Sequence, residues 1–92
     1  MLYVFSNKYY IKDSDLSILF NKDIRRLIKK DKLLKNLCLK INNDYYIYIE
    51  DIIYIVSLIN TNKVLLIYEK IINTYNLVKK YSSPFKIKIN RT

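Results

Sequence analysis

The chain has 92 residues, too few for two hydrophobic cores of ordinary size, so we expect a single domain. Hydrophobic residues make up 51% of it, which excludes a mainly disordered chain, and the net charge of +9 favours an acidic partner such as nucleic acid. Because there is no His and only one Cys, ordinary zinc and haem sites and an internal disulfide are excluded, and we expect no metal and no cofactor.

The N-terminal segment predicts a β-hairpin. Residues 3–5 and 9–11 are aromatic and β-branched, as strands often are. Between them, Ser6-Asn7-Lys8 is short and polar and can form a tight turn.

Two short helices are predicted next, at residues 14–20 and 23–33. Asp13 or Ser14 can cap the first helix, and Asp23 can cap the second. Both helices place apolar residues at i, i+3 and i+4, and the other face of the second helix is basic. This pattern predicts a helix-turn-helix unit whose second helix carries the cations.

A second hairpin is predicted at residues 38–49, because two strand-like runs flank Asn42-Asn43-Asp44, which tolerates turn conformations well. Glu50 and Asp51 place negative charge at the start of a further helix, residues 50–59, where the helix dipole favours it.

The longest helix is predicted at residues 62–80, with Thr61 as its cap and Ser82-Ser83-Pro84 as its end. Residues 85–89 alternate apolar with basic side chains, as in an edge strand or a flexible arm. We therefore expect one domain at residues 1–81 and a basic C-terminal arm at 82–92. The apolar residues of the long helix exceed what one internal face can bury, which predicts a homodimer through residues 62–80.

The fold class expected is α+β: a small winged helix-turn-helix-like domain in which hairpins pack with about four helices, the last one long. Cys38 is expected as a small buried hydrophobic residue. The expected core comprises Leu16, Leu19, Phe20, Ile24, Leu27, Ile28, Ile47, Ile52, Val56, Leu65, Tyr68 and Ile72.

Positive charge concentrates in two segments, residues 22–40 with net +6 and residues 79–92 with net +5, while the rest of the chain is neutral or acidic. Such clustering is the footprint of phosphate contact, although AT-rich coding could also supply single Lys residues on a solvated face. Arg25 and Arg26 form a pair suited to phosphate or guanine contact. The candidate nucleic-acid-binding residues are Lys22, Arg25, Arg26, Lys29, Lys30, Lys32, Lys40, Lys86, Lys88 and Arg91.

The strand tyrosines allow two interpretations. Tyr9, Tyr10 and the tyrosines of residues 45–48 could form a stacking platform for single-stranded bases, or they could be cross-strand packing partners, which is the commoner case. Alternation places Tyr46 and Tyr48 on one face of their strand and Tyr45 on the other, and one of those faces must be core.

Residues 10–59 resemble the winged helix-turn-helix of excisionase and MerR-like proteins: YIKDSDLSILF resembles the first helix, DIRRLIKKDKL the recognition helix and LCLKINNDYYIYIEDI the wing. The glycine usual near the turn is missing. YYIYIEDIIYIVSLINTNKVLLIYEKI is also similar to the viral and phage Bro-N and KilA-N domains, although their Trp and Gly positions are not met. Both resemblances imply DNA binding, as in a viral, phage or mobile-element regulator of transcription.

Catalysis is not expected, because the chain lacks His and Gly-rich loops, and its carboxylate pairs sit where helix starts favour negative charge. The function expected is duplex DNA binding through the basic helix. Two alternatives stay open: a viral or phage inhibitor that acts through a helix-mediated dimer, and an RNA-binding or ribosome-associated protein. No signal peptide or membrane-spanning stretch is seen in the sequence, so an intracellular, soluble protein without a membrane partner is expected.

Overall fold

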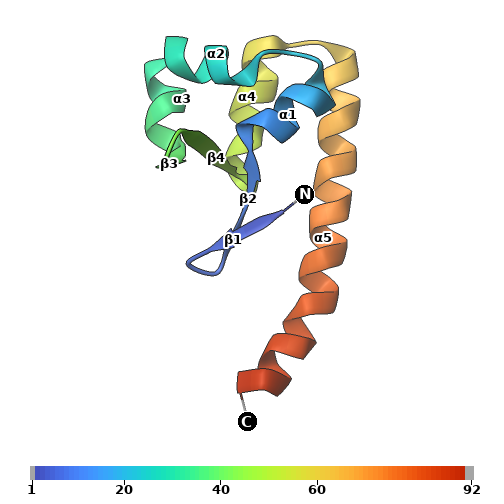
Figure 1. The fold of residues 1–92 in the computed structure, drawn as a ribbon. Coiled ribbons are helices and arrows are strands. Elements are labelled where there is room, and N and C mark those ends of the chain that lie inside the picture. Colours follow the sequence, from blue (N-terminus) through green and yellow to red (C-terminus); the bar gives the residue numbers. More distant parts are fainter. Residues whose placement is uncertain (1, 91–92) are drawn as a thin grey trace.

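The computed structural model describes the backbone of residues 2–90 and the side chains of residues 2–80. The fold is α+β, as predicted, and Figure 1 shows two hairpins and four short helices beside one long helix. In chain order the elements are β1 (Tyr3–Phe5), β2 (Lys8–Lys12), α1 (Asp13–Phe20), α2 (Ile24–Lys30), α3 (Lys32–Leu37), β3 (Leu39–Ile41), β4 (Asp44–Tyr48), the 3-10 turn η1 (Ile49–Asp51), α4 (Ile52–Ile59) and α5 (Asn62–Asn90).

The two hairpins join into one antiparallel sheet with the strand order β1-β2-β4-β3. The central pair, β2 with β4, aligns Ile11 with Ile47 across the segment that holds α1, α2 and α3. This pairing between distant parts of the sequence places the β3–β4 hairpin next to α2.

No helix among the described residues is long and apolar enough to span a membrane.

The chain has no glycine, and among the residues with a described backbone five with positive φ supply the tight corners: Ser6, Asn7, Asn21, Asn42 and Asn60. Four of them are Asn, whose short polar side chain makes the left-handed region accessible. Asn21 ends α1 with φ 51°, and its N–H donates to the carbonyl of Ser17. The glycine missing from the turn between α1 and α2 is thus replaced by an Asn in the left-handed conformation.

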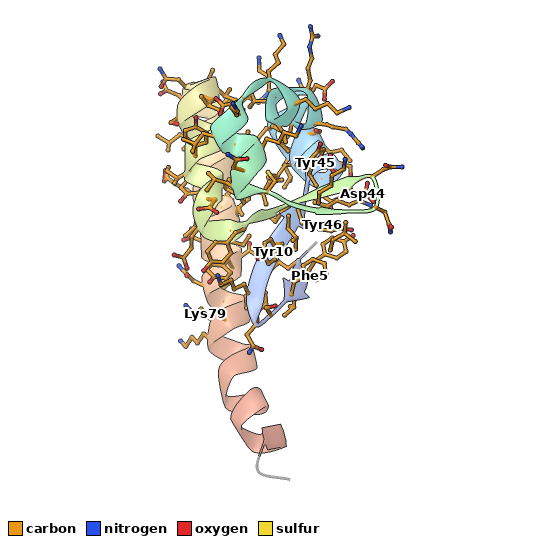
Figure 2. The ribbon with its side chains drawn as sticks, turned by 90° about the vertical axis from the view of Figure 1, so that its left-hand side faces the viewer. Phe5, Tyr10, Asp44, Tyr45, Tyr46 and Lys79 are labelled. Atoms are coloured by element: carbon orange, nitrogen blue, oxygen red, sulfur yellow. The ribbon has the colours of Figure 1, made fainter. Side chains whose placement is uncertain are left out.

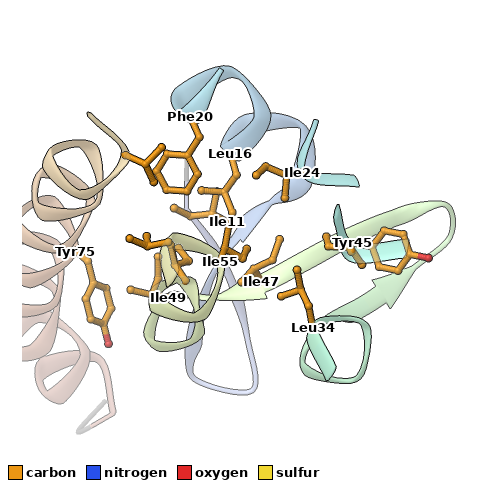
Figure 3. Close-up of a cluster of buried hydrophobic side chains, with 14 residues drawn as sticks. Ile11, Leu16, Phe20, Ile24, Leu34, Tyr45, Ile47, Ile49, Ile55 and Tyr75 are labelled. Carbon is orange, nitrogen blue, oxygen red and sulfur yellow. The ribbon is translucent and has the colours of Figure 1, made fainter. Parts of the chain in front are cut away.

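The core lies between the sheet and the helices, and Figure 3 shows side chains from almost every element meeting there. Leu16, Ile24, Ile28, Ile47 and Ile52 are fully buried, as predicted. Its buried hydrophobic side chains are Ile11, Leu16, Phe20, Ile24, Ile28, Leu34, Tyr45, Ile47, Ile49, Ile52, Ile55, Val56, Val64 and Tyr75.

One helix between the hairpins and two core positions differ from the prediction. The helix expected at residues 23–33 is two helices, because Asp31 adopts an extended backbone and its carboxylate accepts the Leu34 N–H at 2.9 Å, which starts α3. Leu19 is 43% exposed and Leu65 is 44% exposed. On α5 the inward face runs through Val64 and Tyr75, and Leu65 is one residue out of that phase.

The long helix does not end at Ser82-Ser83-Pro84, and residues 85–89 are not a strand: the helical backbone continues to Asn90. Pro84 lies within this helix, although a proline there lacks the N–H of one helical hydrogen bond and its ring crowds the preceding turn. Arg91 lies outside the described residues.

Candidate nucleic-acid interface

The cationic surface is built on α2. Ile24 and Ile28 are fully buried, so they fix the rotation of this short helix on the core. The opposite side is exposed and presents Arg26, Lys29 and Lys30. A shallow hollow of about 300 Å³ lies on this side, lined by Asp23, Arg25, Arg26, Lys29 and Lys30. We call Arg26, Lys29 and Lys30 the cationic face of α2.

The start of α2 is held by two side chains. The carboxylate of Asp23 accepts the N–H of Arg26 at 3.1 Å, which makes Asp23 the cap predicted from the sequence. The hydroxyl of Ser17, from α1, accepts the N–H of Ile24 at 3.0 Å. The angle between α1 and α2 is therefore set by hydrogen bonds as well as by packing.

Arg25 and Arg26, expected to act as a pair, have different environments. The Arg26 side chain is exposed, whereas the Arg25 guanidinium donates to the backbone carbonyl of Asn43 at the tip of the β3–β4 hairpin. Its Nη1 also lies 3.9 Å from a carboxylate oxygen of Asp13, a residue only 2% exposed. Arg25 thus connects α2 to the hairpin and to the first residue of α1.

The ring of Tyr45 completes this connection. The Arg25 guanidinium carbon lies 5.7 Å from the ring centroid, and the Lys40 amine lies 5.6 Å from it. Both distances fall in the range of cation–π contacts. Figure 2 shows Tyr45 on the side of the hairpin that faces the short helices. Lys40, exposed on β3, therefore adds positive charge next to α2.

The other predicted residues are less closely grouped. Lys22 is exposed in the turn before α2, and Lys32 is exposed at the first position of α3. Lys86 and Lys88 lie on the last part of α5, where side chains are not described, and Arg91 lies beyond the described residues. The structure thus brings the cationic face of α2, Arg25 and Lys40 together around the β3–β4 hairpin.

Two contributors were missed from the sequence. The sequence predicts Asp13 or Ser14 as the cap of α1, but the cap position is Lys12 and has no side-chain hydrogen bond. Asp13 is instead the buried partner of Arg25, and its position between the apolar residues Ile11 and Leu16 is the available signal. Tyr54 donates hydrogen bonds of 3.0 and 3.1 Å to the two carboxylate oxygens of Asp31. This contact ties α4 to the break between α2 and α3, and no sequence pattern indicated it.

The single thiol of the chain, Cys38, is held in its neutral form. Burial, together with the negative charges of Asp13 and Asp51, raises the pKa of the Cys38 thiol to about 12, so the thiol is neutral at physiological pH. Among the described residues, no group of three or more Cys, Asp or Glu side chains could hold a metal ion.

An apolar groove of about 420 Å³ runs between α5 and the N-terminal strands, with Leu19 and Ile71 in its lining.

The arrangement can therefore bind an anion by charge and hydrogen bonding at the shallow hollow beside α2. Comparison of the chain with protein-family models, with curated proteins and with solved structures finds no match.

Proposed function

We propose that the chain binds nucleic acid, duplex DNA in preference, through the cationic face of α2 and the adjoining β3–β4 hairpin. The observation that carries this proposal is the orientation of α2: Ile24 and Ile28 are buried, so Arg26, Lys29 and Lys30 face outward together. Phosphate oxygens are the natural partners of such a cluster. In this proposal α1 and α2 act as a helix-turn-helix, and the β3–β4 hairpin acts as a wing that lies over the DNA backbone.

The roles within the interface follow from the contacts. Lys29 and Lys30 neutralise phosphates, and Arg26, exposed near the start of α2, is free to reach a base edge. Arg25 serves as a positioning residue, because its guanidinium is already engaged by Asn43, Asp13 and Tyr45. A regulator of viral, phage or mobile-element transcription would use such a module.

The test is a salt titration of duplex affinity, measured by fluorescence anisotropy. The triple variant Arg26→Ala, Lys29→Ala, Lys30→Ala should weaken binding and lower the slope of log affinity against log salt by roughly 0.9 for each phosphate that is no longer neutralised. The matched control is Lys63→Ala, Lys70→Ala, Lys80→Ala, which removes the same charge from exposed positions of α5. Equal losses of affinity in both variants would refute the assignment to α2, and tighter binding of structured RNA would select the RNA-binding alternative.

The exposed leucines of α5 favour a second candidate, a protein contact through this helix. Leu66 is 60% exposed and Leu77 is 55% exposed. Large apolar side chains at such positions are often covered by a partner or by a second copy of the chain. The predicted homodimer through residues 62–80 is tested by light scattering at tens of micromolar, where Leu66→Lys with Leu77→Lys should abolish association if α5 forms the interface.

A further inference from the structure

The face of the sheet turned away from the short helices is aromatic. Alternation along the strands puts Ile11 and Ile47 in the core, and it puts their neighbours on the other side. We call this the outer aromatic face, formed by Tyr3, Phe5, Tyr10, Tyr46 and Tyr48. All five side chains are partly exposed. Figure 2 shows Phe5, Tyr10 and Tyr46 on the side of the β3–β4 hairpin opposite to Tyr45.

The five rings form one connected array. The Tyr46 ring lies between those of Tyr3 and Phe5, with centroid distances of 5.1 Å and 5.2 Å. Phe5 lies 5.5 Å from Tyr10, and Tyr10 lies 5.8 Å from Tyr48. Most of these pairs meet edge to face, a geometry that fixes the rings while leaving part of each ring face open.

Such a face is unusual for an antiparallel sheet with one covered side, where the open side normally carries polar residues. Cross-strand packing explains why neighbouring rings touch, but polar side chains would serve the solvated side of the sheet equally well. Open sheets that bind single strands use aromatic rings in this position, because every base has a π-face that can stack on them.

The charges around this face suit an anionic chain. The amine of Lys8 lies 5.3 Å from the Tyr48 ring centroid, and Lys8 has no ion pair among the described residues. Of the nearby carboxylates, Asp44 pairs with Lys12 at 3.3 Å, and Glu50 accepts the Tyr48 hydroxyl at 2.8 Å. Asp51 lies within electrostatic reach of Lys8 without forming an ion pair with it. A phosphate next to a stacked base could therefore pair with Lys8, on a chain whose net charge is +9.

We propose that the outer aromatic face binds single-stranded nucleic acid by stacking unpaired bases on Tyr46 and its neighbouring rings, with Lys8 contacting the backbone phosphate. This site lies on the opposite side of the sheet from the cationic face of α2. The proposal does not rest on duplex binding by α2.

The experiment titrates labelled thymidine and uridine 12-mers into the protein at fixed salt. Tyr46→Leu keeps an apolar side chain but removes the ring, and it should weaken binding at least about fivefold, as expected when one base–ring stack is removed. Tyr46→Phe keeps the ring and should bind within about twofold of the parent. Comparing the two oligomers shows whether DNA or RNA is the better ligand.

A spectroscopic readout avoids dependence on the variants. In the parent protein, the ring protons of Phe5, Tyr10 and Tyr46 should shift upfield when the 12-mer is added, and equal amounts of duplex should not cause this shift. The triple Ala variant of α2 should retain the shift even if it no longer binds duplex, so the two proposals fail separately.

Two results would overturn the stacking proposal. One is single-strand binding that leaves these ring resonances unchanged or is equally tight in a folded Tyr46→Leu variant. The other is a concentration-dependent dimer that broadens the same resonances without oligomer, since a second copy would then be the occupant. If Tyr46→Leu does not fold, Tyr10→Leu and the parental titration decide the question.

Discussion

The two faces of the sheet use their tyrosines in different ways. On the covered face, Tyr45 is 3% exposed and lies between two cations, Arg25 and Lys40, so its ring is part of a fixed connection between a hairpin and a helix. On the outer face, Tyr46 is partly exposed, and its ring meets the rings of Tyr3 and Phe5. Lys12 lies opposite it on β2. Of these two adjacent residues, Tyr45 thus helps to hold the hairpin to a helix, and Tyr46 contributes to an exposed surface.

The largest expected effect concerns the thiol of Cys38, a residue expected to be buried that is partly buried in the structure. Cys38 packs against the core, and burial raises its pKa to about 12. Because only the thiolate reacts, iodoacetamide should modify Cys38 about 50-fold more slowly at pH 8 in the native protein than in urea. The rate should keep rising above pH 10, measured by mass spectrometry, and a native profile that levels off near pH 9 would contradict this environment.

The raised pKa of Cys38 also makes the stability of the fold depend on pH. The folded state holds the Cys38 proton more tightly than the unfolded state, so this contribution is complete below the unfolded pKa and is lost as the pH rises toward about 12. Replacing Cys38 with Ser, whose hydroxyl does not titrate in this range, should flatten the alkaline part of the stability profile in urea titrations.

The next effect is a difference between Arg25 and Arg26 in what their replacement costs in unfolding free energy. Arg25→Ala leaves the buried carboxylate of Asp13 without its cation and the Asn43 carbonyl without its donor, and it should cost about 1–3 kcal/mol in urea unfolding. Arg26→Ala, at an exposed position, should cost less than about 0.5 kcal/mol.

A double-mutant cycle gives the control for this pair. Arg25→Ala should cost less when Asp13 is already Asn, because no buried charge is then left unpaired. In duplex binding, Arg26→Ala should cost about 1–3 kcal/mol on a preferred sequence, whereas Arg25→Ala should lower affinity for all sequences with the salt slope unchanged. A reduced slope for Arg25→Ala would make Arg25 a phosphate contact.

A smaller effect concerns the break between α2 and α3. Tyr54→Phe removes both hydrogen bonds to Asp31 and should cost about 1 kcal/mol. Burial and the bond to Asp31 also raise the pKa of the Tyr54 hydroxyl, in keeping with a phenol that acts only as a donor. Tyr68→Phe is the matched control, since Tyr68 makes no hydrogen bond among the described side chains. Equal costs for the two variants would contradict the Tyr54 role.

The sequence predicts those features of the fold that depend on local chemistry. Both hairpins, the caps at Asp23 and Thr61 and half of the buried hydrophobic residues follow from alternation, turn residues and helical spacing. Asp31 shows where this reasoning fails. The helical spacing of apolar residues continues on both sides of Asp31, which predicts one helix, but the Asp31 carboxylate caps a new helix. The same carboxylate accepts a hydrogen bond from the hydroxyl of Tyr54, 23 residues away. Such a partner depends on the tertiary fold.

In the candidate site too, features set by the local sequence could be predicted and features set by the tertiary fold could not. The charge cluster at residues 22–40 and the exposure of Lys29 and Lys30 could be predicted, since helical spacing sets both. The separate environments of Arg25 and Arg26 could not, because they depend on the register that brings Asn43 next to α2. Similarly, alternation separates Tyr45 from Tyr46, but only the pairing of β2 with β4 decides which of them is buried.

The smallest expected effect compares the turns of the two hairpins. Ser6 opens the β1–β2 turn with φ 51°, and Asn42 opens the β3–β4 turn with φ 56°. Asn adopts the left-handed region more readily than Ser, because its side-chain amide can bond to the local backbone. Ser6→Asn should therefore stabilise the protein by about 0.5 kcal/mol, and Asn42→Ser should destabilise it by a similar amount. Urea unfolding of the two variants and of the double exchange, which should be nearly neutral, measures both effects. If Ser6→Asn destabilised the protein, the β1–β2 turn would not have the left-handed conformation described, and the alignment of Phe5 with Lys8 that places Phe5 beside Tyr46 would also be in question.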